Sequence, residues 1–184
     1  LSLALSSGDD TKTVYGWLRD TAGNIGGPAS DNITLGTVAP SEVTISLAGG
    51  DNYTTTDNVT VALTGNDNNS SIKGYFLSES STTPGVSSFA SVSAVNSYSS
   101  TLSFTLSSGE GEKMVYAWLH DVAGNISGFA SDNITLDTTA PTSSIGTPST
   151  TLTSSGSVTF TVTYTGANNV TLVGDNVTVT TTGT

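Results

Sequence analysis

The 184-residue chain carries 15 acidic and 4 basic residues, a formal charge of -11, and no cysteine. So few Lys and Arg side chains cannot neutralise the phosphates of a nucleic acid, and an anionic membrane surface is disfavoured for the same reason. No apolar run approaches the roughly 18 residues of a membrane span, so we expect no nucleic-acid partner and no direct membrane insertion.

One long phrase occurs twice. Residues 2–40 match residues 103–141 at 26 of 39 positions, always with an offset of 101. A repeat of this period predicts tandem structural units. We expect the C-terminal part of a first unit at 1–40, a complete unit at 41–141 and the N-terminal part of a third at 142–184. The chain is thus interpreted as a window cut from a longer array.

Short runs of Val, Ile, Thr, Tyr and Phe alternate with Ser, Thr and Asn, and Gly, Asn, Asp and Pro separate them. This pattern predicts antiparallel β structure. Taken in chain order, the expected strands are 2–5, 13–19 and 32–35 in the first unit; 43–47, 58–65, 72–79, 89–95 (an edge strand), 100–106, 113–120 and 133–136 in the complete unit; and 157–163, 170–172 and 176–181 in the third.

Seven short strands in about 100 residues are typical of an immunoglobulin-like or fibronectin III-like sandwich. The predicted fold class is therefore all-β, with one complete and two partial β-sandwiches. Ala39 and Pro40 close the first unit, since proline cannot donate to a strand ladder.

The strand at 113–120 has two distinct faces. Alternation places Val115, Ala117 and Leu119 on one face, and Tyr116 and Trp118 on the other, together with His120. Because Arg19 replaces His120 in the first copy, we expect this second face to point outward. Two interpretations remain open for Tyr116 and Trp118: cross-strand packing that fastens neighbouring strands, or a stacking platform for sugar rings or a partner protein.

Each copy continues with Asp-x-Ala-Gly-Asn, at 20–24 and 121–125. Gly and Asn tolerate a left-handed backbone, and the Asp side chain can accept bonds from backbone N–H groups two or three residues on. The motif therefore predicts a compact hairpin turn, and calcium ligation is the alternative interpretation.

Loop topology predicts where acidic side chains meet. Carboxylates gathered where rigid units join are the oxygen ligands that Ca²⁺ prefers. The first junction would gather Asp9, Asp10, Asp67 and Asp121. The second would gather Asp51, Asp57, Glu110, Glu112 and Asp137.

Catalytic signatures are missing from the sequence. There is one His and no Cys, and no HExxH, CxxC, P-loop or GxSxG motif. His120 is replaced by Arg19 in the other copy, which removes the one candidate for a catalytic histidine. We expect no enzymatic activity and no required cofactor.

The runs YFLSESSTTP (75–84), SFTLSSGEGEKMVYAWLHDVAGNIS (103–127) and SDNITLDTTAP (131–141) carry a family resemblance. They resemble the tandem bacterial Ig-like repeats of large secreted and cell-surface, adhesin-type proteins. The resemblance implies an extracellular stalk or adhesin array. In related giant adhesins a linker Asp binds Ca²⁺ between domains, which maps to Asp137; Gly36 stands at that position in the first copy.

The expected function is a structural or adhesive spacer, outside a bacterial cell or on its surface. Its partners would be the neighbouring repeats and a host or cell-surface glycan or protein. The alternative is a carbohydrate- or protein-binding module, or an accessory domain of a secreted enzyme.

Overall fold

A computed structural model of the chain describes residues 1–151, 154 and 157–166. These residues are all-β, with two short 3₁₀ turns. The chain falls into two compact units, residues 1–137 and 138–184. None of the described helical turns has the length or apolarity to cross a membrane. The strands predicted at 170–172 and 176–181 lie outside the described residues.

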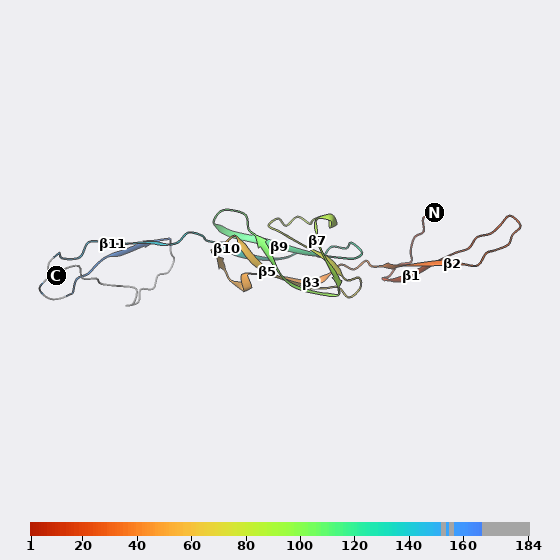
Figure 1. The fold of residues 1–184 in the computed structure, drawn as a ribbon, viewed down its shortest axis with the longest axis horizontal. Coiled ribbons are helices and arrows are strands. Elements are labelled where there is room, and N and C mark those ends of the chain that lie inside the picture. Colours follow the sequence, from red (N-terminus) through yellow and green to blue (C-terminus); the bar gives the residue numbers. More distant parts are fainter. Residues whose placement is uncertain (152–153, 155–156, 167–184) are drawn as a thin grey trace. The chain divides into compact units, whose positions relative to one another are not determined.

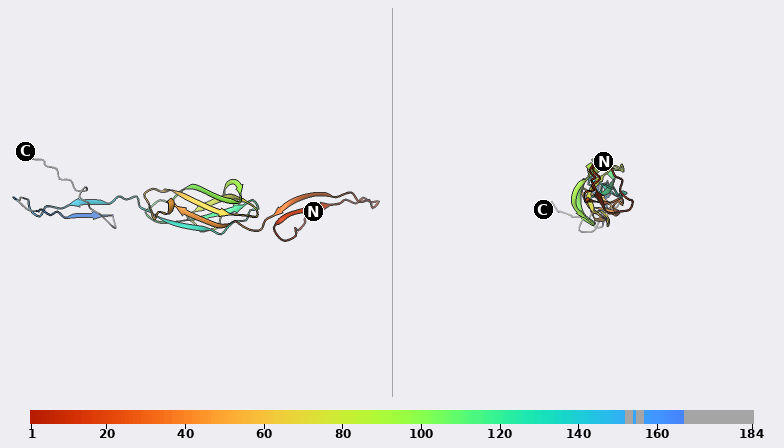
Figure 2. Two further views of the ribbon diagram at one scale, coloured as in Figure 1. Left: turned by 90° about the horizontal axis from the view of Figure 1, so that it is seen from below. Right: turned by 90° about the vertical axis from the view of Figure 1, so that its right-hand side faces the viewer.

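The complete repeat folds into two packed sheets (Figures 1 and 2). One sheet has the order β3-β5-β8 and the other the order β4-β10-β9-β6-β7. The first sheet contains β3 (Ser41–Leu47), β5 (Asn58–Asn66) and β8 (Ser97–Thr105). The second contains β4 (Tyr53–Thr54), β6 (Ile72–Ser78), β7 (Ala90–Val95), β9 (Gly111–Asp121) and β10 (Ala130–Leu136). The 3₁₀ turns are η1 (Ala48–Gly50) and η2 (Val86–Ser88).

The seven strands predicted for this repeat are confirmed, each within three residues at either end. β7 lies at a sheet edge, as expected. The sequence did not predict β4, which has two residues and pairs in parallel with β10. So short a strand has no periodicity of its own, and only its neighbour β10 holds it extended.

Alternating apolar residues build the core between the sheets. On β9, Val115, Ala117 and Leu119 are fully buried, which confirms the predicted inner face. They meet Val61 and Leu63 of β5 across the sandwich. Burying a Val or Leu side chain contributes about 1.5–3 kcal/mol, so this two-sheet core is the main source of stability in the repeat.

A glycine in β6 is required by the close approach of a histidine. A Cβ atom at Gly74 would lie 2.5 Å from His120 Nε2 and 2.8 Å from the Ala90 carbonyl oxygen. We expect Gly74→Ala to lower the free energy of unfolding by about 1–3 kcal/mol, the usual cost of overpacking. Gly16→Ala is the matched control, because the nearest atom to its new Cβ is 4.0 Å away. Equal denaturation midpoints for the two variants would contradict the prediction.

The second copy of the phrase is β9–β10, and the first copy forms the same hairpin on its own. β1 (Asp10–Gly16) pairs with β2 (Ala29–Leu35), and Asp10 faces Leu35 as Gly111 faces Leu136. The register is therefore identical after the offset of 101.

The strand predicted at 2–5 is wrong, because those residues have no strand partner. Of their equivalents in the complete repeat, residues 103–105 belong to β8, which pairs with β5. By the 101-residue offset, residues 1–40 correspond to residues 102–141, a range that does not include β5. The strand predicted at 13–19 also ends earlier, at Gly16.

The C-terminal unit contains one described hairpin. β11 (Thr142–Ile145) pairs with β12 (Val162–Thr165). The strand predicted at 157–163 is confirmed only for its last two residues, and β11 was not predicted. The chain divides into compact units after Asp137, while the predicted boundary at Pro40 stays a prediction.

Candidate functional site

The two Asp-x-Ala-Gly-Asn turns have the same geometry. In each, the Asp carboxylate accepts the backbone N–H and the side-chain amide of the Asn four residues on. The distances are 2.8 and 2.8 Å from Asn24 to Asp20, and 2.8 and 2.7 Å from Asn125 to Asp121. The glycine between them has φ +95° in the first copy and +93° in the second. The predicted turn is confirmed, although its main acceptor bond spans four residues instead of two or three.

In the complete repeat, this turn joins a second acidic loop. Ser70 Oγ lies 2.6 Å from Asp121 Oδ2 and 3.1 Å from Asp67 Oδ2, and both Asp side chains are buried. Asp67 also accepts the N–H groups of Asn69 and Ser70. A hydroxyl has a single proton to donate, so the two carboxylates compete for it. Two of the acidic residues predicted for the first junction therefore meet.

The same turn contacts the segment that precedes the repeat. Asn125 Nδ2 donates to the Gly36 carbonyl oxygen at 3.1 Å. A Cβ at Gly36 would lie 3.2 Å from Ser70 Cβ and 3.4 Å from Ala123 Cβ. Gly36, noted in the sequence only for lacking a ligating side chain, thus allows close packing of the linker on the turn. Ser70 and the reach of Asn125 were missed, because sequence spacing does not show which loop meets the linker.

Asp9 is bonded to the same linker. Its Oδ1 accepts the Thr37 hydroxyl at 2.6 Å and the Thr37 N–H at 3.0 Å. These bonds, the hydroxyl first, lower the pKa of Asp9 below its ordinary value of 3.8. At pH values above the ordinary pKa of Asp9, the contact therefore contributes fully to the stability of the linker. This stabilisation is lost as the pH falls through the lowered pKa.

We expect Thr37→Val to raise the pKa of Asp9 toward its ordinary value, because the larger of the two bonding contributions is removed. A carboxyl-detected NMR titration measures it directly. Thr11→Val is the control, since Thr11 Oγ1 pairs with Thr34 and not with Asp9. An unchanged Asp9 titration in Thr37→Val would contradict the assignment.

The acidic residues predicted for the second junction lie at exposed positions, on loops and, for Glu112, on β9. Asp51, Asp57 and Asp137 are exposed. The backbone N–H of Asp137 donates to the Thr54 carbonyl oxygen at 2.9 Å, and Glu112 accepts the Asn133 amide at 3.0 Å. Across the described ranges, no group of three or more His, Asp or Glu side chains converges enough to hold a metal ion. Calcium binding stays a prediction.

The predicted outward position of Trp118 needs correction. Its ring lies on the sheet face opposite the core, but it is only 1% exposed. Phe76 and Phe129 cover it, with ring centroids 6.0 and 5.9 Å away, and Tyr116 lies beside it at 6.1 Å. A buried ring has no free face, so Trp118 is not available as a stacking platform in this conformation.

In the first copy the same pair is uncovered. Tyr15 and Trp17 have ring centroids 6.1 Å apart, and Trp17 is 58% exposed. Pro28 stands where the complete repeat has Phe129. The two copies therefore differ in what covers the pair, although the pair itself has the same spacing.

His120 is held in a structural position. It is buried, its Nδ1 lies 2.8 Å from the Asp121 carbonyl oxygen, and its ring meets the Phe89 ring edge-on at 4.7 Å. These contacts hold the His120 ring in place against Phe89 and the start of the turn.

Comparisons with known proteins identify no relative: no family model, no curated protein and no solved structure matches the chain.

Proposed function

We propose that the chain is a non-enzymatic spacer made of tandem immunoglobulin-like β-sandwich repeats, belonging to a large bacterial protein that acts outside the cell or on its surface. The observation that carries this proposal is the contact of Asn125 with Gly36. A turn whose residues recur 101 positions apart is bonded to the segment that enters its own repeat. Such a contact restrains the junction, which is what a spacer requires.

Residual dipolar couplings test the restraint. A spacer requires that one alignment tensor fit the amides of β1–β2 and of the central sandwich in the parent chain. In Asn125→Ala the two sets of amides should require two separate tensors. Asn24→Ala is the control: it alters the equivalent turn of the first copy, where the Asn makes no bond to the linker, and one tensor should still fit. Two independent tensors in the parent chain would contradict the spacer.

Calcium is part of this proposal as a stiffening ion at the junctions. A ligand at 100 times its Kd stabilises the folded state by about 2.7 kcal/mol. We therefore expect a higher melting temperature in Ca²⁺ than in EGTA, and a smaller difference in Asp121→Asn for the first junction and Asp137→Asn for the second. Superimposable melting curves in Ca²⁺ and EGTA would rule the ion out.

The second candidate function is recognition of a glycan or protein, alone or as an accessory domain of a secreted enzyme. The exposed Tyr15 and Trp17 rings favour it, since paired aromatic faces stack on sugar rings. A glycan array probed with the intact chain and with Trp17→Ala tests it. Glycan binding that persists in Trp17→Ala, or no binding by the intact chain, would contradict recognition through this aromatic pair and leave the spacer as the single proposal.

A further inference from the structure

The two sheets of the complete repeat have four edges, and three of them are blunted. On β3 the register with β5 shifts between Ser41 and Thr44. The Leu47 N–H of the same strand donates to the Asp132 carboxylate of β10 at 2.8 Å. The edge strand β4 is two residues long, and β7 pairs with β6 through a register shift. Bulges, short strands and charges at an edge are the features that keep a sheet from pairing with another chain.

The fourth edge, β8, has none of these features. All nine of its residues pair with β5 in one unbroken register. Its sequence, SYSSTLSFT, contains no charged residue and no proline. β5 is its one strand partner among the described residues, which include every position from 41 to 141. Alternate N–H and C=O groups along the other side of β8 are therefore open to a further strand.

The first copy is also uncharged at the equivalent positions. Residues 1–7, LSLALSS, stand 101 positions before LSFTLSS at 102–108. The two positions that differ are Leu3 and Ala4, in place of Phe104 and Thr105. Both copies therefore lack the charge that would protect this edge.

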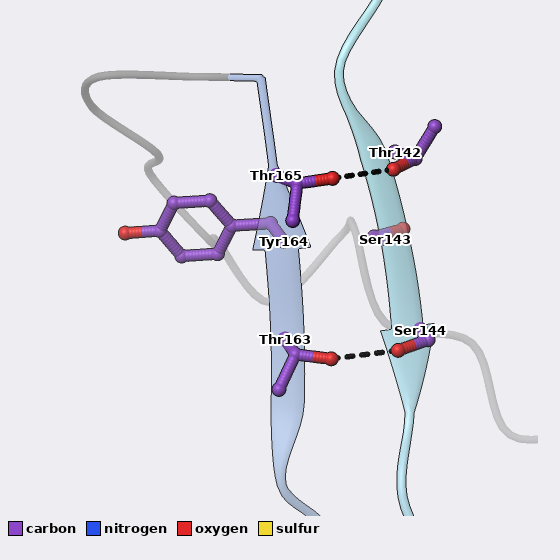
Figure 3. Close-up of a pocket in the computed structure, with 6 residues that line it drawn as sticks. All are labelled: Thr142, Ser143, Ser144, Thr163, Tyr164 and Thr165. Carbon is purple, nitrogen blue, oxygen red and sulfur yellow. Dashed lines mark hydrogen bonds between the residues drawn. The ribbon is translucent and has the colours of Figure 1, made fainter.

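Hydroxyl pairs join the exposed faces of neighbouring strands elsewhere in the chain. A Thr–Thr pair with 2.7 Å between the Oγ1 atoms joins β3 to β5. Two more pairs link β11 to β12, Thr142 with Thr165 at 2.8 Å and Ser144 with Thr163 at 2.6 Å between the hydroxyl oxygens (Figure 3). Cross-strand hydroxyl pairs of this kind stabilise a sheet.

The exposed positions of β8 carry hydroxyl groups as well; they are Ser97, Ser99, Thr101, Ser103 and Thr105. We propose that β8 pairs antiparallel with β8 of a second copy of this chain, with Thr101 on the two-fold axis. This register overlaps all nine residues, and it places Ser97 opposite Thr105 and Ser99 opposite Ser103. Every pair on the exposed face across the axis is then a hydroxyl pair, and no charges meet.

The inner face of β8 fits the same register. Tyr98 is buried and Phe104 packs partly buried against the core, and the two-fold axis sets each of them opposite the other in the second copy. Aromatic pairs across neighbouring strands add to the stability of a sheet. Both molecules use the same edge, so the contact is isologous and association stops at a dimer. The inference does not depend on the spacer function.

Sedimentation velocity on the intact 184-residue chain tests the proposal. About 0.15 M salt screens the repulsion between two chains of formal charge -11. The weight-average mass should rise from 18.6 kDa with concentration and level off at twice that value. Thr101→Lys places two like charges together at the axis and should weaken dimerisation at least about 10-fold. Thr60→Lys is the matched control and should dimerise like the parent, because Thr60 is exposed on the same sheet face but on the central strand β5.

Charge complementation separates loss of the interface from loss of folding. Thr101→Glu should also dimerise weakly by itself. An equimolar mixture of Thr101→Lys and Thr101→Glu should recover the dimer, because opposite charges then meet at the axis. A mixture that stays monomeric overturns the proposal, and so does a parent chain that remains at 18.6 kDa up to about 1 mM. A mass beyond twice the monomer value, or equal affinities for the parent and Thr101→Lys, also overturns it, since association would then use another surface.

Discussion

Trp118→Ala should lower the free energy of unfolding of the complete repeat by about 3–5 kcal/mol, the range for removing a large buried aromatic side chain. The ring is 1% exposed and lies under Phe76 and Phe129. Its removal leaves a cavity between rings from β6 and from the loop before β10, which cannot both close in on it. Chemical denaturation followed by far-UV circular dichroism measures the change.

Trp17→Ala is the matched control, because it removes the same residue from the other copy of the phrase. Trp17 is 58% exposed, so we expect a change within about 0.5 kcal/mol, as for other surface positions. Comparable losses of unfolding free energy in the two variants would mean that Trp118 stabilises the repeat through its place in the strand and not through the burial of its ring.

Asp121→Ala should cost about 2–4 kcal/mol in the free energy of unfolding. Its carboxylate accepts bonds from Asn125 N, Asn125 Nδ2 and Ser70 Oγ. Buried donors that lose a charged acceptor retain their desolvation cost, about 1–3 kcal/mol each, and the relief of repulsion from Asp67 offsets part of the total. Thermal and urea unfolding both report the loss.

Asp20→Ala supplies the comparison, because Asp20 forms the same two bonds with Asn24 in solvent. Bonds from Asn24 lower the pKa of Asp20, yet water can replace them at an exposed turn, so we expect little change in the unfolding of the complete repeat. Asp121→Asn should fall between parent and Asp121→Ala, since an amide oxygen still accepts. An unchanged free energy of unfolding in Asp121→Ala would show that the turn does not stabilise the junction.

Local patterns predicted the strands well wherever both strand partners are present. Period-2 alternation was enough to assign Val115, Ala117 and Leu119 to the core, because the backbone alone decides which side chains share a face. Alternation could not decide whether the other face meets water. That depends on Phe129 and Phe76, which come from a loop and a neighbouring strand.

The candidate site was predictable to a similar extent. The repeated Asp-x-Ala-Gly-Asn motif predicted a turn with an Asp acceptor, because those side chains bond to their own backbone. Loop topology also predicted that Asp67 and Asp121 approach each other. The bridging Ser70 and the Asn125–Gly36 bond depend on how two loops and a linker pack, which spacing along the chain does not encode.

The sequence by itself determined the all-β class, the 101-residue offset and the inner face of each repeated strand, because these follow from backbone geometry and residue identity. Tertiary structure alone decided whether identical residues in the two copies are buried or exposed. Trp17 and Trp118 occupy the same position in the same phrase, as do Ile33 and Ile134. One of each pair is exposed and the other buried, because burial is a property of the surfaces that pack on a strand.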